Sequence, residues 1–336
     1  MNKKFINAIK TSRISKILLL KVSLISVFLF SELVLRILGY LPFQAIDNLD
    51  TPVMFEYDHY LGWRNKKGNY TFQLHGDNIN TTILHNRTRV TGEKQGDLQK
   101  KIICIGGSYT QGWAISDNET YPWKIQKKFR NFDVLNYGTS GYGTYQSLLL
   151  LKNIIPKTKS PKIVIYGFID HHEQRNIARQ DWLLLLSNLS KRNHIYTPYV
   201  SLAKNKKLAF HPPEKYPKWP FSHYSSFISM VNRKYVYIKT MSRRHQRKIT
   251  KELLSLMNKY CDRSNIILLI AILKANDDMK KQYISFFKKN DIYYVDCVFP
   301  FTADMVVKGD GHPNGKLNTL WAQKLSRALQ EFVNKN

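Results

Sequence analysis

Two groups of residues, about two hundred positions apart, have the types that acyl-transfer chemistry needs. Ser108 follows an apolar run directly and stands after two glycines, Gly106 and Gly107. Asp310 and His312 lie two residues apart in a glycine-rich segment. A serine hydroxyl that is activated by an imidazole, which a carboxylate orients in turn, can attack an ester carbonyl. Ser108 is therefore a candidate nucleophile, and the segment with Asp310 and His312 holds polar side chains that could lie at the same edge of a sheet.

The segments that must position these residues alternate between short apolar runs and helical stretches. Buried strands are expected at about 102–105, 132–135, 162–168, 265–273 and 292–295. Helices are expected at about 119–130, 146–153, 244–260, 280–289 and 316–332. This alternation predicts an α/β fold with a doubly wound, mainly parallel sheet. Ligands of such sheets bind at the carboxyl ends of the strands, which is where Ser108 falls.

The order of the polar blocks resembles the SGNH (GDSL-type) hydrolases, including their membrane-anchored bacterial members. Residues 106–112 (GGSYTQG) look like the serine block of that family, 136–147 (NYGTSGYGTYQS) like its glycine block, and 310–315 (DGHPNG) like its Asp/His block. The resemblance covers about residues 100–332. It implies a three-layer, flavodoxin-like fold and a triad of Ser108, His312 and Asp310. It also implies an oxyanion hole formed by the backbone amides of Ser108 and Gly141.

The sequence departs from the family pattern at three positions. Gly107 stands where many members have Asp, and Asp310 lies two residues before the histidine instead of three. Ile169 stands where the third block usually carries an Asn that completes the oxyanion hole. Loss of one such donor typically lowers turnover ~10²–10³-fold. Asp170 and His171 are candidate supporting residues beside the site.

The amino-terminal region is expected to hold the chain in a membrane. Residues 1–16 form a basic tail, and residues 17–41 are apolar over a length that spans a bilayer. The basic flank predicts a single-pass anchor with a cytoplasmic amino terminus and an extracytoplasmic catalytic domain, in the periplasm or at the cell surface. Glu32 and Arg36 are four residues apart and can pair. A cleaved signal peptide and a helix lying in the membrane surface are the alternatives.

The remaining chain divides into three parts. Residues 42–98 are expected to form a small β-rich lead-in, with strands at 70–74 and within 81–90. Trp63 in this region is either a packed tryptophan, which is the more common case, or a platform for a sugar ring. Residues 99–334 form the hydrolase-like domain. An insertion at about 175–243, rich in aromatic residues, prolines and lysines, is a candidate lid or substrate contact.

The charge and the cysteine content limit which classes of partner are expected. The formal net charge of +28 suits an anionic glycan or lipid headgroups, and no RNA- or DNA-binding motif accompanies it, so nucleic acid is not expected. Three scattered cysteines give no disulfide framework and no zinc motif. The proposed chemistry needs no metal or cofactor.

These observations lead to one hypothesis and two alternatives. The hypothesis is a membrane-anchored ester hydrolase or acyltransferase that acts on acyl, in particular O-acetyl, esters of a cell-envelope glycan. The alternatives are a degenerate, weakly active or inactive glycan-binding relative and a structural envelope protein. The acyl group, the choice between hydrolysis and transfer, and the oligomeric state are left open by the sequence.

Overall fold

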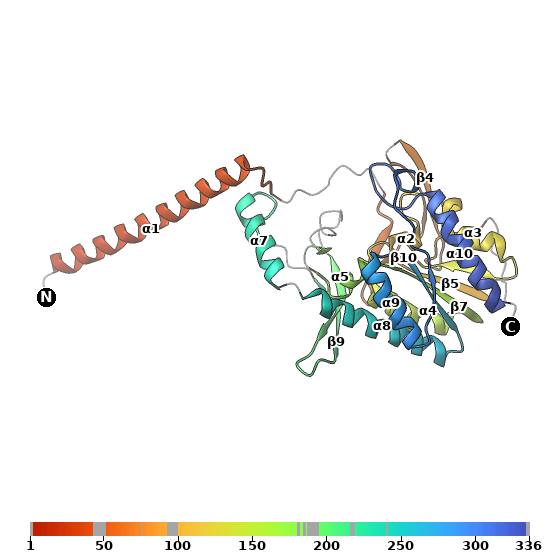
Figure 1. Ribbon diagram of the computed structural model, residues 1–336. Helices are drawn as coiled ribbons and strands as arrows, with labels where there is room; N and C mark the ends of the chain where they lie inside the picture. The colour runs from red at the N-terminus through yellow and green to blue at the C-terminus, as the bar shows by residue number, and fades with distance from the viewer. Residues whose placement is uncertain are drawn as a thin grey trace. The chain divides into compact units, whose positions relative to one another are not determined.

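The computed structural model describes residues 3–42, 52–74, 76–92, 100–179, 182–183, 186, 195–215, 219–239 and 241–333, without the side chains of 3–14 and 236–239 (Figure 1). The chain divides into two compact units. One contains residues 1–47 and 217–240, and we call it the helical unit. The other contains residues 48–216 and 241–336, and we call it the sheet unit.

A five-stranded sheet is the centre of the sheet unit. Its spatial order is β11 (Tyr293–Asp296), β10 (Ile267–Lys274), β7 (Pro161–Ile169), β5 (Lys101–Gly106) and β6 (Asp133–Asn136), and every neighbouring pair is parallel. The expected doubly wound parallel sheet is thus confirmed. The chain starts the sheet at β5, builds β6 on one side of it, and then crosses to β7 on the other side. The carboxyl ends of β5 and β7 therefore flank the point where the winding direction changes, which is where open α/β sheets bind ligands.

Strand β5 shows why the sheet is covered on both faces. All six of its residues are buried, so neither face meets water. Ile103 and Ile105 contribute to one core, and Ile102 and Cys104 contribute to the other. The first core also contains residues of α4 (Thr144–Ile154), α8 (Arg243–Arg263) and α9 (Asp277–Lys289), and the second contains residues of α3 (Tyr121–Lys128) and α10 (Gly315–Val333) (Figure 1). The result is a three-layer arrangement.

Two short antiparallel hairpins form the described part of the lead-in. They pair β1 (Phe55–Asp58) with β2 (Gly62–Asn65), and β3 (Gly68–Leu74) with β4 (Asp77–Ile83). The strand expected within 81–90 ends at Ile83, because the chain turns at Arg87, which adopts a φ of 71°. The expected insertion contains a third hairpin, β8 (Tyr196–Leu202) with β9 (Leu208–Lys215), in the sheet unit. Short 3-10 helices cover Asp117–Glu119, Ile155–Lys157 and Ala303–Met305.

The helical unit consists of α1 (Lys3–Ile37) and α7 (Ser226–Lys239). Within α1, Ser15–Ile37 is long and apolar enough to cross a membrane, with a mean hydropathy of 2.2. The expected pair forms, since Arg36 donates to Glu32 at 2.7 Å. Glu32 also accepts hydrogen bonds from the backbone amides of Ser226 and Phe227, both at 2.9 Å. It thereby satisfies amides of the first turn of α7 that have no partner within the helix.

Candidate active site

The turn that presents Ser108 depends on glycine at the end of β5. Gly106 has a φ of +148°, and a Cβ there would lie 2.5 Å from Oγ1 of Thr110 and 2.9 Å from the carbonyl oxygen of Gly167. A side chain at this position would therefore collide with backbone across the sheet. The turn leads directly into α2 (Ser108–Gln111), of which Ser108 is the first residue. Its side chain is buried at the carboxyl edge of the sheet.

The structure brings Ser108, His312 and Asp310 into one hydrogen-bonded chain. Nε2 of His312 lies 3.1 Å from Oγ of Ser108, and Nδ1 lies 2.5 Å from Oδ1 of Asp310. The backbone amide of His312 donates to the same Oδ1 at 3.0 Å. Gly311 adopts a φ of +81°, and the resulting turn lets an aspartate only two residues before the histidine reach its ring. The shorter spacing noted in the sequence is thus accommodated locally.

The ionised state of Asp310 determines which nitrogen of the His312 ring donates and which accepts a hydrogen bond. Burial raises the pKa of Asp310, but hydrogen bonds from His312 and Trp113 together with the nearby imidazole outweigh burial, so the pKa lies below its ordinary value. An ionised carboxylate only accepts hydrogen bonds. Nδ1 of His312 must therefore donate to it, which leaves Nε2 of the neutral ring as the acceptor for the Ser108 hydroxyl.

Gly141 has a left-handed backbone conformation and lies next to two tryptophan side chains. Its φ is +87°, and a Cβ there would lie 2.9 Å from Trp63 and 3.4 Å from Trp182. Trp63 comes from the lead-in, and its indole nitrogen donates to the carbonyl oxygen of Ser140 at 2.9 Å. In the described part of the chain, no hydrogen bond occupies the backbone amides of Ser108 and Gly141. Within the described residues, both N–H groups are therefore without an intramolecular acceptor.

A buried polar network, which the sequence did not predict, joins the turn that carries Ser108 to the glycine loop, by which we mean the part of the glycine block that follows β6 (137–143). Gln111 donates to Oδ1 of Asn65 at 3.0 Å and accepts from the backbone amide of Ser140 at 3.1 Å. Asn136 donates to the carbonyl oxygen of Thr110 at 3.0 Å. Gln111 belongs to the serine block and Asn136 to the glycine block, so their position within these blocks was a signal in the sequence that they could lie near the site. Nothing in the pattern pointed to Asn65, because it lies in the lead-in.

The predicted supporting residues lie at the carboxyl end of β7. The backbone amide of Asp170 donates to the carbonyl oxygen of Lys274 at 3.0 Å, and Oδ1 of Asp170 accepts from the backbone amide of His171 at 2.9 Å. Within the described residues, no hydrogen bond joins either side chain to Ser108, His312 or Asp310.

Two further side chains on the short helix α5 (His172–Asn176) are buried beside the serine turn. A Cβ on Gly107 would lie 2.9 Å from Nη1 of Arg175 and 3.1 Å from Nε2 of His172. Nη1 of Arg175 also donates to the carbonyl oxygen of Tyr142 at 3.0 Å. Arg175 lies where the expected insertion begins, and His172 lies just before it. The only signal in the sequence was the presence of titratable residues after a buried strand.

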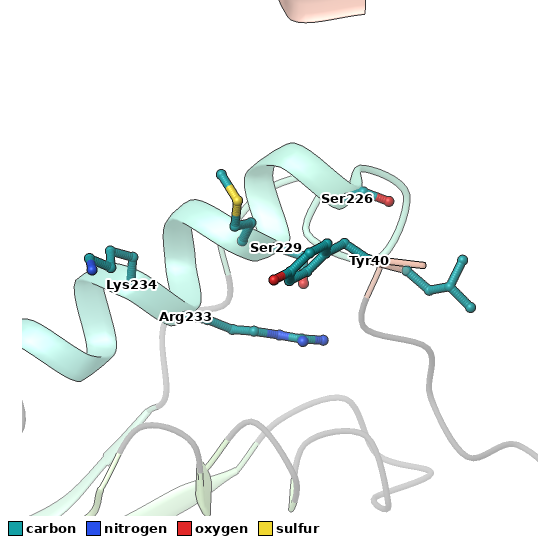
Figure 2. Close-up of a pocket in the computed structure, with 7 residues that line it drawn as sticks. Tyr40, Ser226, Ser229, Arg233 and Lys234 are labelled. Atoms are coloured by element: carbon teal, nitrogen blue, oxygen red, sulfur yellow. The ribbon is translucent and has the colours of Figure 1, made fainter. Parts of the chain in front are cut away.

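The described residues contain no cluster of three or more His, Cys, Asp or Glu side chains with a geometry that could hold a metal ion. A pocket of about 290 Å³ occurs in the helical unit, and Figure 2 shows the side chains around it. It is lined by Tyr40, Leu41, Ser226, Ser229, Met230, Arg233 and Lys234. This lining contains serines but no histidine or carboxylate that could activate them.

Comparison with known proteins gave matches only among solved structures. No family model and no curated protein matches the sequence. A lipolytic protein of the G-D-S-L family from Desulfitobacterium hafniense is similar with a TM-score of 0.41 and 13% identity, covering 68% of this chain and 98% of that one. A psychrotrophic esterase from Pseudoalteromonas has a TM-score of 0.41 and 10% identity, covering 70% and 98%. An acetylxylan esterase from Geobacillus stearothermophilus has a TM-score of 0.38 and 11% identity, covering 68% and 92%.

Proposed function

We propose that this chain is an SGNH-type serine ester hydrolase or acyltransferase. The observation that carries the proposal is the continuous contact from Oγ of Ser108 through the imidazole of His312 to the carboxylate of Asp310, at 3.1 and 2.5 Å. A nucleophile, a base and a group that orients the base are thereby within hydrogen-bond distance of one another. Their place at the switch point of a parallel sheet supports the same reading.

The reaction would proceed through an acyl-enzyme. Nε2 of His312 accepts the hydroxyl proton as Oγ of Ser108 bonds to the ester carbonyl carbon, and the carbonyl oxygen takes the negative charge. The backbone amides of Ser108 and Gly141 donate to that oxygen. When the ester C–O bond breaks, the leaving alcohol takes the proton from His312. Water or a sugar hydroxyl then attacks the acyl-enzyme by the same steps in reverse, which gives hydrolysis or transfer.

For the substrate, we propose O-acyl esters, in particular O-acetyl esters, of a cell-envelope glycan. The net charge of +28 favours an anionic polymer or an anionic membrane surface. The two tryptophans beside Gly141, Trp63 and Trp182, offer apolar surface against which a sugar ring can pack. The substitution of Ile169 for the family's Asn favours the degenerate, weakly active glycan binder as the second candidate, and the experiment below separates the two.

The apolar part of α1 is proposed to anchor the chain, with the amino terminus in the cytoplasm and the sheet unit outside it. The span Ser15–Ile37 supports this by its length and composition. Beyond the span, Tyr40 lines the pocket of the helical unit, and tyrosine is enriched at membrane–water interfaces (Figure 2). Carbonate extraction of membranes, combined with protease access to the sheet unit from the outer side, tests the anchor and its orientation.

The function is tested by fluorophosphonate labelling of the full-length protein in detergent, read by intact mass. We expect one adduct on the wild type and on Ser264→Ala, a control at an exposed serine that ends α8. We expect none on Ser108→Ala or His312→Ala. Release of acetate from an O-acetylated glycan by the wild type and Ser264→Ala, but not by Ser108→Ala or His312→Ala, would then support the substrate class. A folded wild type that takes no adduct would reject the esterase and leave the glycan binder, which a binding assay with the same glycan would detect.

A further inference from the structure

The side chain that replaces the family's oxyanion-hole Asn is part of a hydrophobic core. Ile169 is buried, with 1% of its surface exposed, and it belongs to the hydrophobic core on the α3 and α10 side of the sheet. An aliphatic side chain in that core donates no hydrogen bond. If the oxyanion has a third donor, that donor is another residue at the same edge of the sheet.

Arg175 lies six residues further along the chain and connects the two loops of the proposed oxyanion hole. Its Nη1 donates to the carbonyl oxygen of Tyr142, the neighbour of Gly141, at 3.0 Å. On its other side, Nη1 lies 2.9 Å from the position that a Cβ of Gly107, the neighbour of Ser108, would occupy. The guanidinium group thus contacts the residues next to both amides that the oxyanion would use.

The guanidinium of Arg175 is a buried cation without a contacting anion. Only 8% of Arg175 is exposed, and no described carboxylate lies within ion-pair distance of it. Its Nε has no hydrogen-bond partner, and its Cζ stacks 4.4 Å from the ring centroid of Trp182. Burial lowers the pKa of Arg175 to about 10, so the group is still charged at neutral pH. Asp170 attracts this charge from beyond ion-pair distance. A buried charge without a contacting carboxylate is still costly, and an anion formed transiently beside it would lower that cost.

The same arrangement accounts for the glycine that replaces the family's Asp in the serine block. A side chain at position 107 would overlap Nη1 of Arg175 and Nε2 of His172, which lie 2.9 and 3.1 Å from the Cβ position. Arg175 can occupy its place only if residue 107 has no side chain. The position of Arg175 therefore explains two departures from the family pattern. It requires a glycine at position 107, and it would supply the donor that is lost with Ile169.

We propose that Arg175 is a further catalytic residue, whose guanidinium supplies the charged donor of the oxyanion hole in place of the family's Asn. This proposal rests on the proposed esterase function. As Ser108 attacks, the carbonyl π electrons move to oxygen, and the resulting oxyanion accepts from Arg175 as well as from the amides of Ser108 and Gly141. No proton leaves the guanidinium. Collapse of the intermediate returns the electrons to the carbonyl and expels the alcohol.

The test compares Arg175→Met and Arg175→Lys with the wild type in the full-length protein, using the small neutral ester p-nitrophenyl acetate. Removal of the charge should lower kcat ~10²–10³-fold and leave KM within about threefold, since the interaction forms only in the transition state. Arg175→Lys should recover part of the lost kcat. Arg247→Met is the matched control, because Arg247 is also largely buried and binds Glu173 of the same helix α5 at 3.0 Å. It should keep kcat within threefold.

The outcomes separate this proposal from the esterase proposal. If the wild type turns over the ester and Ser108→Ala does not, but Arg175→Met retains kcat or changes only KM, Arg175 is not an oxyanion donor. If kcat per fluorophosphonate-titrated site is unchanged while the titratable fraction falls, its role is structural and the proposal fails. If the wild type shows no Ser108-dependent turnover, both proposals fail together. Should Arg175→Met not fold, Arg175→Gln, which keeps a polar tip for the carbonyl oxygen of Tyr142, is judged by the same criteria.

Discussion

Trp113 donates from its indole nitrogen to Oδ2 of Asp310 at 3.3 Å, while Oδ1 of the same carboxylate binds the imidazole of His312. The carboxylate is therefore held at both oxygens. Trp113 follows the serine turn in the chain, so one side chain links the block that carries the nucleophile to the block that carries the base. Trp113 thereby favours the orientation of Asp310 in which Oδ1 faces the ring of His312.

Trp113→Phe is expected to lower kcat about five- to tenfold with little change in KM. Loss of a hydrogen bond to a charged group typically costs ~1–3 kcal/mol, and the 3.3 Å distance places this bond at the weak end. Steady-state kinetics with p-nitrophenyl acetate measure the effect. Trp123→Phe, a change at a partly exposed tryptophan of α3, is the control and should leave kcat unchanged. Equal losses in both variants would contradict a specific role for Trp113.

Gly141→Ala should abolish most activity while the protein still folds. Alanine at a φ of +87° costs ~1–2 kcal/mol in backbone strain, and its Cβ would also press on Trp63 at 2.9 Å, displacing the amide that faces the substrate. We expect kcat to fall at least about tenfold. Gly76→Ala is the matched control, because Gly76 has a φ of +96° with nothing within 4 Å of its Cβ position. It should lower the melting temperature and leave kcat intact. Normal kcat in Gly141→Ala would exclude this amide from the oxyanion hole.

Asn65→Leu is expected to destabilise the sheet unit and also to lower activity. The side chain donates to the carbonyl oxygen of Gly138 at 3.0 Å and accepts from Gln111, and both partners would be left buried without it. Each such loss costs ~1–3 kcal/mol in the free energy of unfolding. Chemical denaturation checks this, with Asn69→Leu, an exposed position in β3, as the control. An unchanged denaturation midpoint in Asn65→Leu would show that the lead-in does not brace the glycine loop.

Buried His172 should make the sheet unit less stable in mild acid. Burial lowers the pKa of its imidazole well below the ordinary value, so the folded state keeps the ring neutral, with Nδ1 2.5 Å from the hydroxyl of Tyr166. Below about pH 6.5 the unfolded chain binds a proton that the folded chain does not, so stability decreases as pH falls, by at most ~1.4 kcal/mol per pH unit. Denaturation midpoints measured between pH 7 and 5 should show a shallower slope in His172→Gln. Identical slopes would mean that this histidine does not titrate differently on folding.

The sequence by itself determined the layers of the sheet unit. The aliphatic runs around Ile103, Ile165 and Ile270 are too short for helices and too apolar for exposed strands. They are therefore typical of strands that are buried on both faces of a parallel sheet. The alternation with helices then set the topology, and the topology placed Ser108 at the carboxyl edge. His312 and Asp310 could be predicted as partners of Ser108 because their residue types and the order of the blocks are distinctive.

Only the tertiary structure decided which residues surround that edge. Asn65 and Trp63 reach the glycine loop across more than seventy residues of sequence, and no local pattern encodes such a contact. Arg175 lies in a stretch that composition assigns to an insertion, and its position against Gly107 depends on how β7 leads into α5. Periodicity and turn chemistry are local properties that a sequence displays, whereas the neighbours of a buried side chain are fixed by the packing of the whole domain.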